Sequence, residues 1–156
     1  MISLYALWCG LCWRLRGGLI SDVTHKVFGR GLSTGVTRIV CTLLMVAPLV
    51  VLDPRLAILI PSIFTAMTIP YFDRSMGLEE PWRDHLFLSL WGVAVAGIML
   101  APLAWWNPPA LLWAPLGALA CGAYAAMKPL GGKWTERAEV LVGILFGALL
   151  WGATHG

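Results

Sequence analysis

Six apolar runs, separated by shorter polar segments, make up most of this chain. They cover residues 2–13, 36–52, 56–72, 86–106, 110–127 and 140–153. A bilayer core about 30 Å thick requires roughly 20 helical residues, so the fourth and fifth runs are long enough and the others need their flanking residues. The pattern predicts an all-α, polytopic transmembrane helical bundle of six spans, with residues 1–156 forming a single integral membrane domain.

The first run is the shortest of the six. It reaches a spanning length if Arg14 and Arg16 extend their aliphatic stems to the interface and the helix continues to the Gly17-Gly18 pair. The alternative is a bundle of five spans, with residues 1–13 lying on the cytoplasmic surface. A cleavable signal peptide carries its positive charge before the apolar core, whereas here the basic residues follow it, so we predict a retained anchor.

The charged residues give the bundle an orientation. The composition is 59% hydrophobic and 12% charged, which leaves little soluble mass. With six spans and an outer N-terminus, ten of the eleven Lys and Arg residues fall in inner segments and Arg55 falls outside. Because basic residues favour the cytoplasmic side, we predict a multi-pass protein of the bacterial cytoplasmic (inner) membrane with both termini outside. The basic residues are interspersed with acids, so the net charge of +3 indicates no nucleic-acid partner.

Short connections and prolines shape the predicted helices. The outer connections, Asp53-Pro54-Arg55 and Asn107-Pro108-Pro109, are short enough to make the helices on either side antiparallel neighbours. Proline removes a backbone donor and frees a carbonyl, which in a membrane must be satisfied by a neighbour, a water or a ligand. We interpret most of these breaks as structural, with a ligand-coordinating break as the alternative. The prolines inside the runs are Pro48, Pro61, Pro70, Pro102 and Pro115.

Residues 17–35, between the first two runs, form a distinct segment. Apolar residues recur there at helical spacing, while Asp22, His25 and Lys26 fall on another face. This pattern predicts a cytoplasmic interfacial or re-entrant helix, serving either as a surface-lying helix or as a gate. The apolar positions are Leu19, Ile20, Val23, Val27 and Phe28.

Arginines dominate the chemistry of the predicted inner face. Guanidinium groups bind carboxylate and phosphate through two parallel hydrogen bonds. We therefore predict a site for a small anionic solute or a lipid phosphate headgroup, and we expect the bundle to bind or transport that anion. The alternative is that these residues only orient the chain and pair with neighbouring acids. The candidate substrate-binding residues are Arg14, Arg16, Arg38 and Arg137.

The segment 131–139 opens the last run and holds two acids. Thr135 is the predicted N-cap, and Glu136 follows in the first turn, where the helix dipole favours a negative group. Glu139 stands at the base of the apolar run, so we expect a partner among Arg14, Arg16 and Arg38. Its role is either a structural salt bridge or a proton carrier.

A membrane-embedded enzyme acting on a phosphate-bearing lipid at the inner leaflet is the second hypothesis. Its acid and base would come from His25, Glu136 and Glu139, with the arginines holding the phosphate. Known catalytic motifs do not identify a reaction, so the catalytic residues stay open. The three histidines lack metal-ligand spacing, and we predict neither a metal site nor a cofactor.

The last run carries a GxxxG spacing at Gly143 and Gly147, which lets another helix approach closely. The partner helix lies either inside the bundle or in a second subunit, and we lean toward a homo-oligomer. A non-catalytic factor that binds another membrane protein through this face is the third hypothesis.

One short cysteine motif has a known mechanism. Cys9, Leu11, Cys12 and Arg16 resemble the Cys-x-Leu-Cys motif, followed four residues later by Arg, of the bacterial membrane oxidoreductases that pass electrons from thiols to quinone. The resemblance implies a thiol redox protein. It covers one short stretch, and the preceding span and the second cysteine pair of those proteins are absent from this chain. The alternative is that both cysteines pack as small hydrophobic residues.

Overall fold

In the computed structural model, the described part of the chain excludes residues 17, 69–80, 106, 128–129, 131 and 156. All its regular secondary structure is helical, which confirms the all-α class. The α-helices are α1 (Ile2–Arg16), α2 (Leu19–Leu52), α3 (Leu59–Thr68), α4 (Pro81–Ala104), α5 (Leu116–Met127) and α6 (Lys133–His155). Two 3-10 helices, η1 (Pro54–Ile58) and η3 (Pro108–Trp113), precede α3 and α5.

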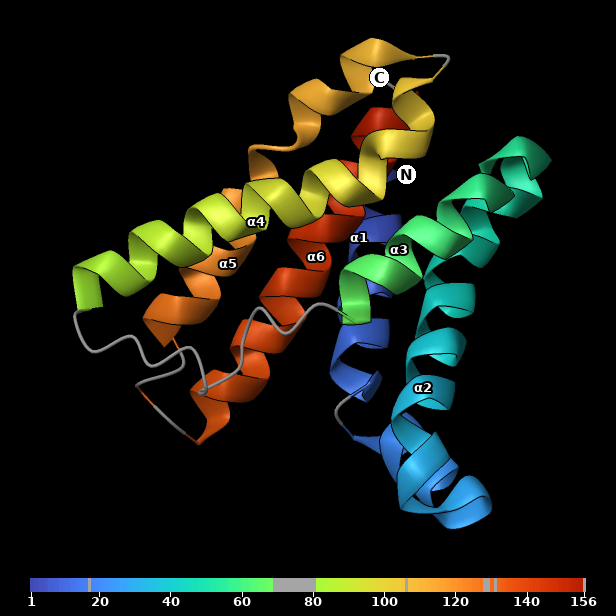
Figure 1. The fold of residues 1–156 in the computed structure, drawn as a ribbon, viewed down its shortest axis with the longest axis vertical. Helices are drawn as coiled ribbons and strands as arrows, with labels where there is room; N and C mark the ends of the chain where they lie inside the picture. The colour runs from blue at the N-terminus through green and yellow to red at the C-terminus, as the bar shows by residue number, and fades with distance from the viewer. Residues whose placement is uncertain (17, 69–80, 106, 128–129, 131, 156) are drawn as a thin grey trace.

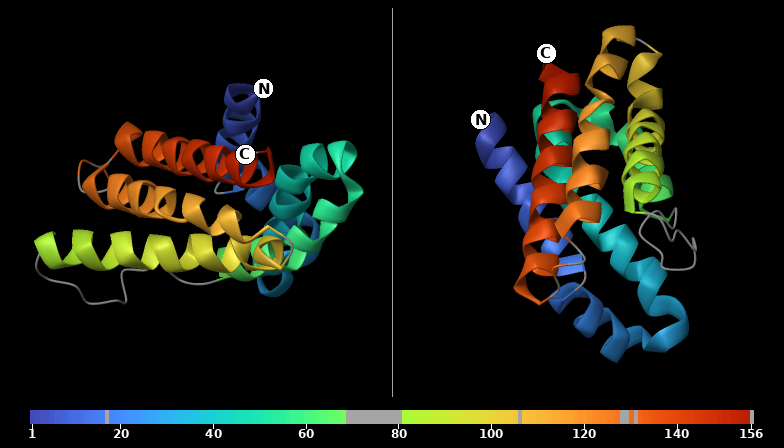
Figure 2. Two further views of the ribbon diagram at one scale, coloured as in Figure 1. Left: turned by 90° about the horizontal axis from the view of Figure 1, so that it is seen from above. Right: turned by 90° about the vertical axis from the view of Figure 1, so that its left-hand side faces the viewer.

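The six α-helices close into a ring. Each packs against the next in the chain, and α1 packs against α6 through the most extensive contact of all (Figure 1). Both termini lie at one end, together with η1 and η3, and we call this the terminal end. The break between α1 and α2 and the start of α6 lie at the opposite end, the Arg14 end (Figure 2). The predicted tight turns between α2 and α3, and between α4 and α5, are confirmed.

Among the described residues, two helices have the length and the apolar composition of a membrane span by themselves. These are α2 over Gly35–Leu52 and α6 over Glu136–His155. Prolines precede α3 and α5, and these helices are shorter than their predicted runs: the run at 56–72 begins as η1, and the run at 110–127 begins as η3. Proline fits the first turn of a helix, but it cannot donate a hydrogen bond further in. The helices therefore provide two candidate spans, and six spans are not shown.

A break divides α2 into two parts. Gly29 has φ 77° and ψ 178°, a conformation that favours glycine, so the preceding helical segment folds back on the following one. The buried hydroxyls of Thr24 and Thr37 are hydrogen-bonded across this hairpin at 2.6 Å. The predicted interfacial segment is thus helical. Its position in a membrane stays a prediction, and its exposed apolar side chains are Leu19, Val23, Val27 and Phe28.

Glycines bring α1 and α6 together. A Cβ atom at Gly143 would lie 2.6 Å from the carbonyl oxygen of Cys9 and 2.7 Å from the Cα of Gly10. A Cβ at Gly147 would lie 2.9 Å from the Cα of Ala6. The GxxxG face therefore receives another helix, as predicted, and that helix is α1 of the same chain. A homo-oligomer stays a prediction.

Small residues also join α4 to α5. Gly92 and Gly117 face one another so closely that a side chain at either would collide with the other backbone. Ala96 and Cys121 pack beside them. Helices in lipid associate through such close backbone contacts, because lipid tails leave little hydrophobic force between them.

The turn at the terminal end between α2 and η1 is closed by an ion pair. Asp53 accepts hydrogen bonds from the backbone N–H of Arg55 at 3.1 Å and from its guanidinium at 3.0 and 3.1 Å. The hydrogen bonds from Arg55 hold the pKa of the Asp53 carboxyl below its usual value. Asp53 therefore stays an anion and an acceptor at the start of η1.

The proline break in α2 is satisfied by a side chain of α1. Pro48 has no N–H, so the carbonyl of Leu44, four residues earlier, loses its helical donor. Trp8 donates its indole N–H to this carbonyl at 2.7 Å, and Tyr5 donates its hydroxyl to the carbonyl of Met45 at 2.7 Å. At Pro48 the structural interpretation therefore holds, and the two hydrogen bonds tie α1 to α2.

We predict that Trp8 and Pro48 are energetically coupled. Trp8→Phe should lower the free energy of unfolding by about 1 kcal/mol, because the Leu44 carbonyl loses its donor. In a Pro48→Ala background the alanine supplies a backbone N–H, so the same change should cost roughly half as much. Unfolding in detergent, followed for the four proteins of the cycle, measures the difference.

Trp105→Phe is the matched control, because Trp105, near the terminal end, is 91% exposed and so contributes little to packing. It should change stability little in either background. Equal costs of Trp8→Phe with and without Pro48 would show that the hydrogen bond to Leu44 is not what the indole contributes.

Candidate anion-binding site

The contact between α1 and α6 places an arginine beside two acids. Arg14 lies in the last turn of α1, opposite the first turns of α6. Its guanidinium Nη2 is 3.1 Å from Oε1 of Glu136, and its Nη1 is 3.9 Å from Oε2 of Glu139. The side chains of Arg14, Glu136 and Glu139 are 34%, 60% and 25% exposed, so Glu139 is the most enclosed of the three. Of the partners expected for Glu139, Arg14 is the one that the described residues place beside it.

The start of α6 corrects one expectation. The helix begins at Lys133, so Thr135 lies inside its first turn and is not the N-cap. Gly132, with φ 54°, takes the backbone into the helix from a conformation that favours glycine. Glu136 does lie in the first turn, as predicted, where a negative group is favourable.

Arg137 lies one residue further and points away from the ion pair. Its guanidinium carbon is 4.9 Å from the centre of the Trp134 ring, a cation–π arrangement, and its side chain is exposed. Within the described part of the chain it has no carboxylate partner. Its N–H groups are therefore available to an anion.

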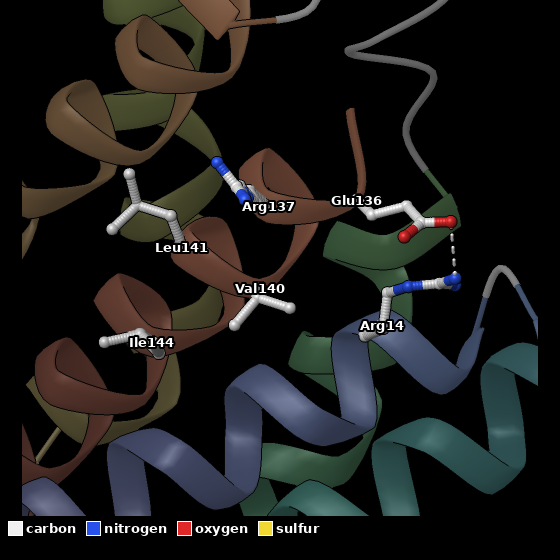
Figure 3. Close-up of a pocket in the computed structure, with 6 residues that line it drawn as sticks. All are labelled: Arg14, Glu136, Arg137, Val140, Leu141 and Ile144. Atoms are coloured by element: carbon white, nitrogen blue, oxygen red, sulfur yellow. Dashed lines mark ion pairs between the residues drawn. The ribbon is translucent and has the colours of Figure 1, made fainter. Parts of the chain in front are cut away.

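Arg14 and Arg137 line the same groove, which has a volume of about 350 Å³. Figure 3 shows Arg14 and Glu136 pointing toward one another between α1 and α6. Three apolar side chains continue the groove along α6, away from the charges: Val140, Leu141 and Ile144. The groove is open at the surface of the bundle and changes from charged to apolar along its length. We call it the Arg14–Arg137 groove.

Arg38 and His25 do not line this groove in the part of the chain that the structure describes. Arg38 is half-buried on α2, and the side chain of Arg16 lies outside the described residues. His25 is exposed on the first segment of α2, and the groove lining does not include it. The structure thus brings together two of the four candidate arginines and two of the three candidate catalytic residues, Glu136 and Glu139.

The interior of the bundle is apolar where the structure describes it. Its buried polar side chains are the hydroxyls of four residues, each hydrogen-bonded within the protein. Ser62, for example, donates to the carbonyl of Met99 in α4 at 3.0 Å. The charged groups of the described chain therefore lie at the ends or the surface of the bundle. The four residues are Thr24, Thr37, Thr42 and Ser62.

The cysteine motif is enclosed by helices. Cys9 and Cys12 are 0% and 1% exposed, and Cys41 donates its thiol to the Cys12 carbonyl at 3.8 Å. Thiol exchange requires an accessible sulfur, so this burial favours the packing role. Cys121 is also buried, and all four cysteines are free thiols. Among the described residues no group of three or more His, Cys, Asp or Glu side chains forms a metal site.

Sequence reasoning missed the apolar part of the groove. Residues 137, 141 and 144 follow a helical spacing of four and three, which places them on one face of α6, so the signal was present. For the contact between Arg137 and Trp134, the sequence offered only the three-residue separation of the two side chains along the predicted helix. Comparisons with known protein families, with curated proteins and with solved structures gave no match.

We predict that Glu139, rather than the closer Glu136, makes Arg14 important for stability. Arg14→Gln should cost about 1 kcal/mol, because the more enclosed carboxylate of Glu139 loses a compensating charge. Adding Glu139→Gln should restore most of that loss. Adding Glu136→Gln, the matched control, should restore little, since that exposed carboxylate is solvated without Arg14. Unfolding in detergent at neutral pH compares the variants, and equal recovery from both glutamines would contradict this assignment.

Proposed function

We propose that this chain is a six-span protein of the bacterial cytoplasmic membrane that binds a phosphate- or carboxylate-bearing anion at its inner face. The observation that carries the proposal is the pair Arg14 and Arg137, which come from opposite ends of the sequence and line one groove. Each guanidinium group can bind an anion with several oxygens through two parallel hydrogen bonds, and Arg137 is the one without a carboxylate partner among the described residues.

The outward surface of α1 supports a membrane location. Leu4, Leu7 and Leu11 recur at helical spacing and are 69%, 58% and 49% exposed. Such a continuous apolar stripe is unfavourable in water, and in soluble monomers it marks a binding surface. In a bilayer it would contact acyl chains, and the ring closed by α1 and α6 would present apolar side chains to lipid.

The distribution of charge supports the orientation. Arg14, Lys133 and Arg137 lie at the Arg14 end, and Arg55 lies at the terminal end. The positive-inside rule then directs the Arg14 end to the cytoplasm and both termini outward.

Arg14 is already paired with Glu136, so an anion would compete for its donors. Glu136 is 60% exposed and can turn into water at little cost, while Glu139 would keep Arg14 in place. Arg137 can bind without giving up an ion pair. Binding thus has direct support in the described residues, whereas transport through the apolar interior stays a prediction.

The proposed orientation predicts which single-cysteine variants react with a membrane-impermeant maleimide. The four natural cysteines are buried, so the background should be low. Arg55→Cys should react in intact cells, and Lys26→Cys should react only after the inner membrane is permeabilised.

Ser3→Cys distinguishes the six-span bundle from the five-span bundle. If the first run spans the membrane, Ser3→Cys should react in intact cells. If that run lies on the cytoplasmic surface, Ser3→Cys should react only after permeabilisation. Labelling of Lys26→Cys but not Arg55→Cys in intact cells would reverse the proposed orientation.

We predict that the purified protein binds inorganic phosphate and that the double variant Arg14→Ala/Arg137→Ala binds it at least tenfold more weakly, because each lost charge-assisted contact contributes more than 1 kcal/mol. Isothermal titration calorimetry in a neutral detergent measures the affinity. Lys26→Ala/Arg55→Ala is the matched control, because it removes two exposed cations outside the groove. Equal binding by the wild type and the Arg14/Arg137 variant would disprove the site, as would no binding by either.

A further inference from the structure

The Arg14–Arg137 groove changes character along α6 in a defined direction. Glu136 and Arg137 stand in its first turn, and Leu141 and Ile144 stand one and two turns further. At 1.5 Å per residue, the distance along the helix from Arg137 to Ile144 is about 10 Å. A free anion needs only the charged end, so the apolar part requires a ligand that is amphipathic.

The position of the charged end of the groove relative to the bilayer agrees with an amphipathic ligand. Trp134, stacked on Arg137, is 44% exposed at the start of α6, and tryptophan favours the level of lipid headgroups. The apolar end then extends toward the middle of the bilayer, because Glu136–His155 is the segment of α6 suited to cross it. A lipid presents its phosphate and its acyl chain in this same order and direction.

The charges at the groove favour one class of headgroup. The groove lining holds Arg14 and Arg137 against the single carboxylate of Glu136, and Arg137 has no carboxylate partner among the described residues. A phosphodiester without a cationic group would complement this excess. A zwitterionic headgroup would bring an amine next to Arg137 as well.

We infer that the Arg14–Arg137 groove binds a single anionic phospholipid of the inner leaflet, with its phosphate at Arg137 and one acyl chain along Val140, Leu141 and Ile144. The inference rests on the function proposed above and names the ligand class of the same site. The groove opens on the surface of the bundle, so the lipid enters sideways from the bilayer.

The test uses the full-length protein in nanodiscs of dioleoylphosphatidylglycerol or dioleoylphosphatidylcholine, followed by native mass spectrometry. We expect one dioleoylphosphatidylglycerol to stay bound to the wild type and no dioleoylphosphatidylcholine. Arg137→Gln should weaken lipid retention about tenfold. Lys26→Gln, an exposed cation outside the groove, should have no effect.

A second variant separates the lipid from the anion. Leu141→Trp fills the apolar part of the groove, so it should abolish lipid retention and leave phosphate affinity unchanged. Leu119→Trp, on an exposed position of α5, is the matched control. If Leu141→Trp fails to fold, Leu141→Phe adds less volume and should weaken retention in the same direction.

The outcomes are distinct. Phosphate binding that depends on Arg14 and Arg137, together with lipid retention unaffected at Leu141, would overturn the lipid inference and leave the anion site. Equal retention of both lipids would also overturn it, since the headgroup would then not be recognised. Loss of phosphate binding and lipid retention in the wild type would remove the inference and the proposed function together.

Discussion

The close approach of α1 to α6 holds the rest of the structure in place. Gly10, Gly143 and Gly147 have no side chains, so the two backbones meet and the ring of helices closes. Because lipid tails are as apolar as leucine, helices in a membrane gain stability mainly from such close contact and from hydrogen bonds. The same approach sets Arg14 beside the first turns of α6. The groove exists because its two walls, which come from the first and last helices, are pressed together.

A second constraint is that backbone carbonyls freed by proline must find donors in an apolar interior. Trp8 donates to the carbonyl that Pro48 leaves free. Elsewhere in the interior, Ser62 of α3 donates its hydroxyl to the carbonyl of Met99 in α4. These two hydrogen bonds hold α1 to α2 and α3 to α4. Chemistry that requires a free charge is left to the Arg14 end, where guanidinium groups meet both water and the apolar side chains of α6.

The sequence predicted the helical class, the short turns at Asp53 and Asn107, and the helical nature of residues 19–28, because apolar periodicity and proline position are local signals. It placed the start of α6 three residues late, since the backbone at Gly132 set the boundary. Within the site, Arg14, Glu136 and Glu139 were named beforehand, but their grouping depends on the α1–α6 contact, which joins residues more than 120 positions apart. Arg38 and His25 were predicted for the site from their cationic or titratable side chains, but they do not line the groove. Residue type does not determine which face of a helix packs against which neighbouring helix.

The closure of the ring by the first and last helices has a consequence for biosynthesis. The segment that becomes α1 leaves the ribosome well before α6, yet its main packing surface belongs to α6. Until α6 follows, the face around Gly10 is uncovered, and Arg14 lacks the two glutamates that accompany it in the finished protein. Contacts between residues so far apart in sequence form late and slowly. The nascent chain must therefore hold α1 in a provisional position until α6 is made, and the Arg14–Arg137 groove is assembled only when α6 arrives.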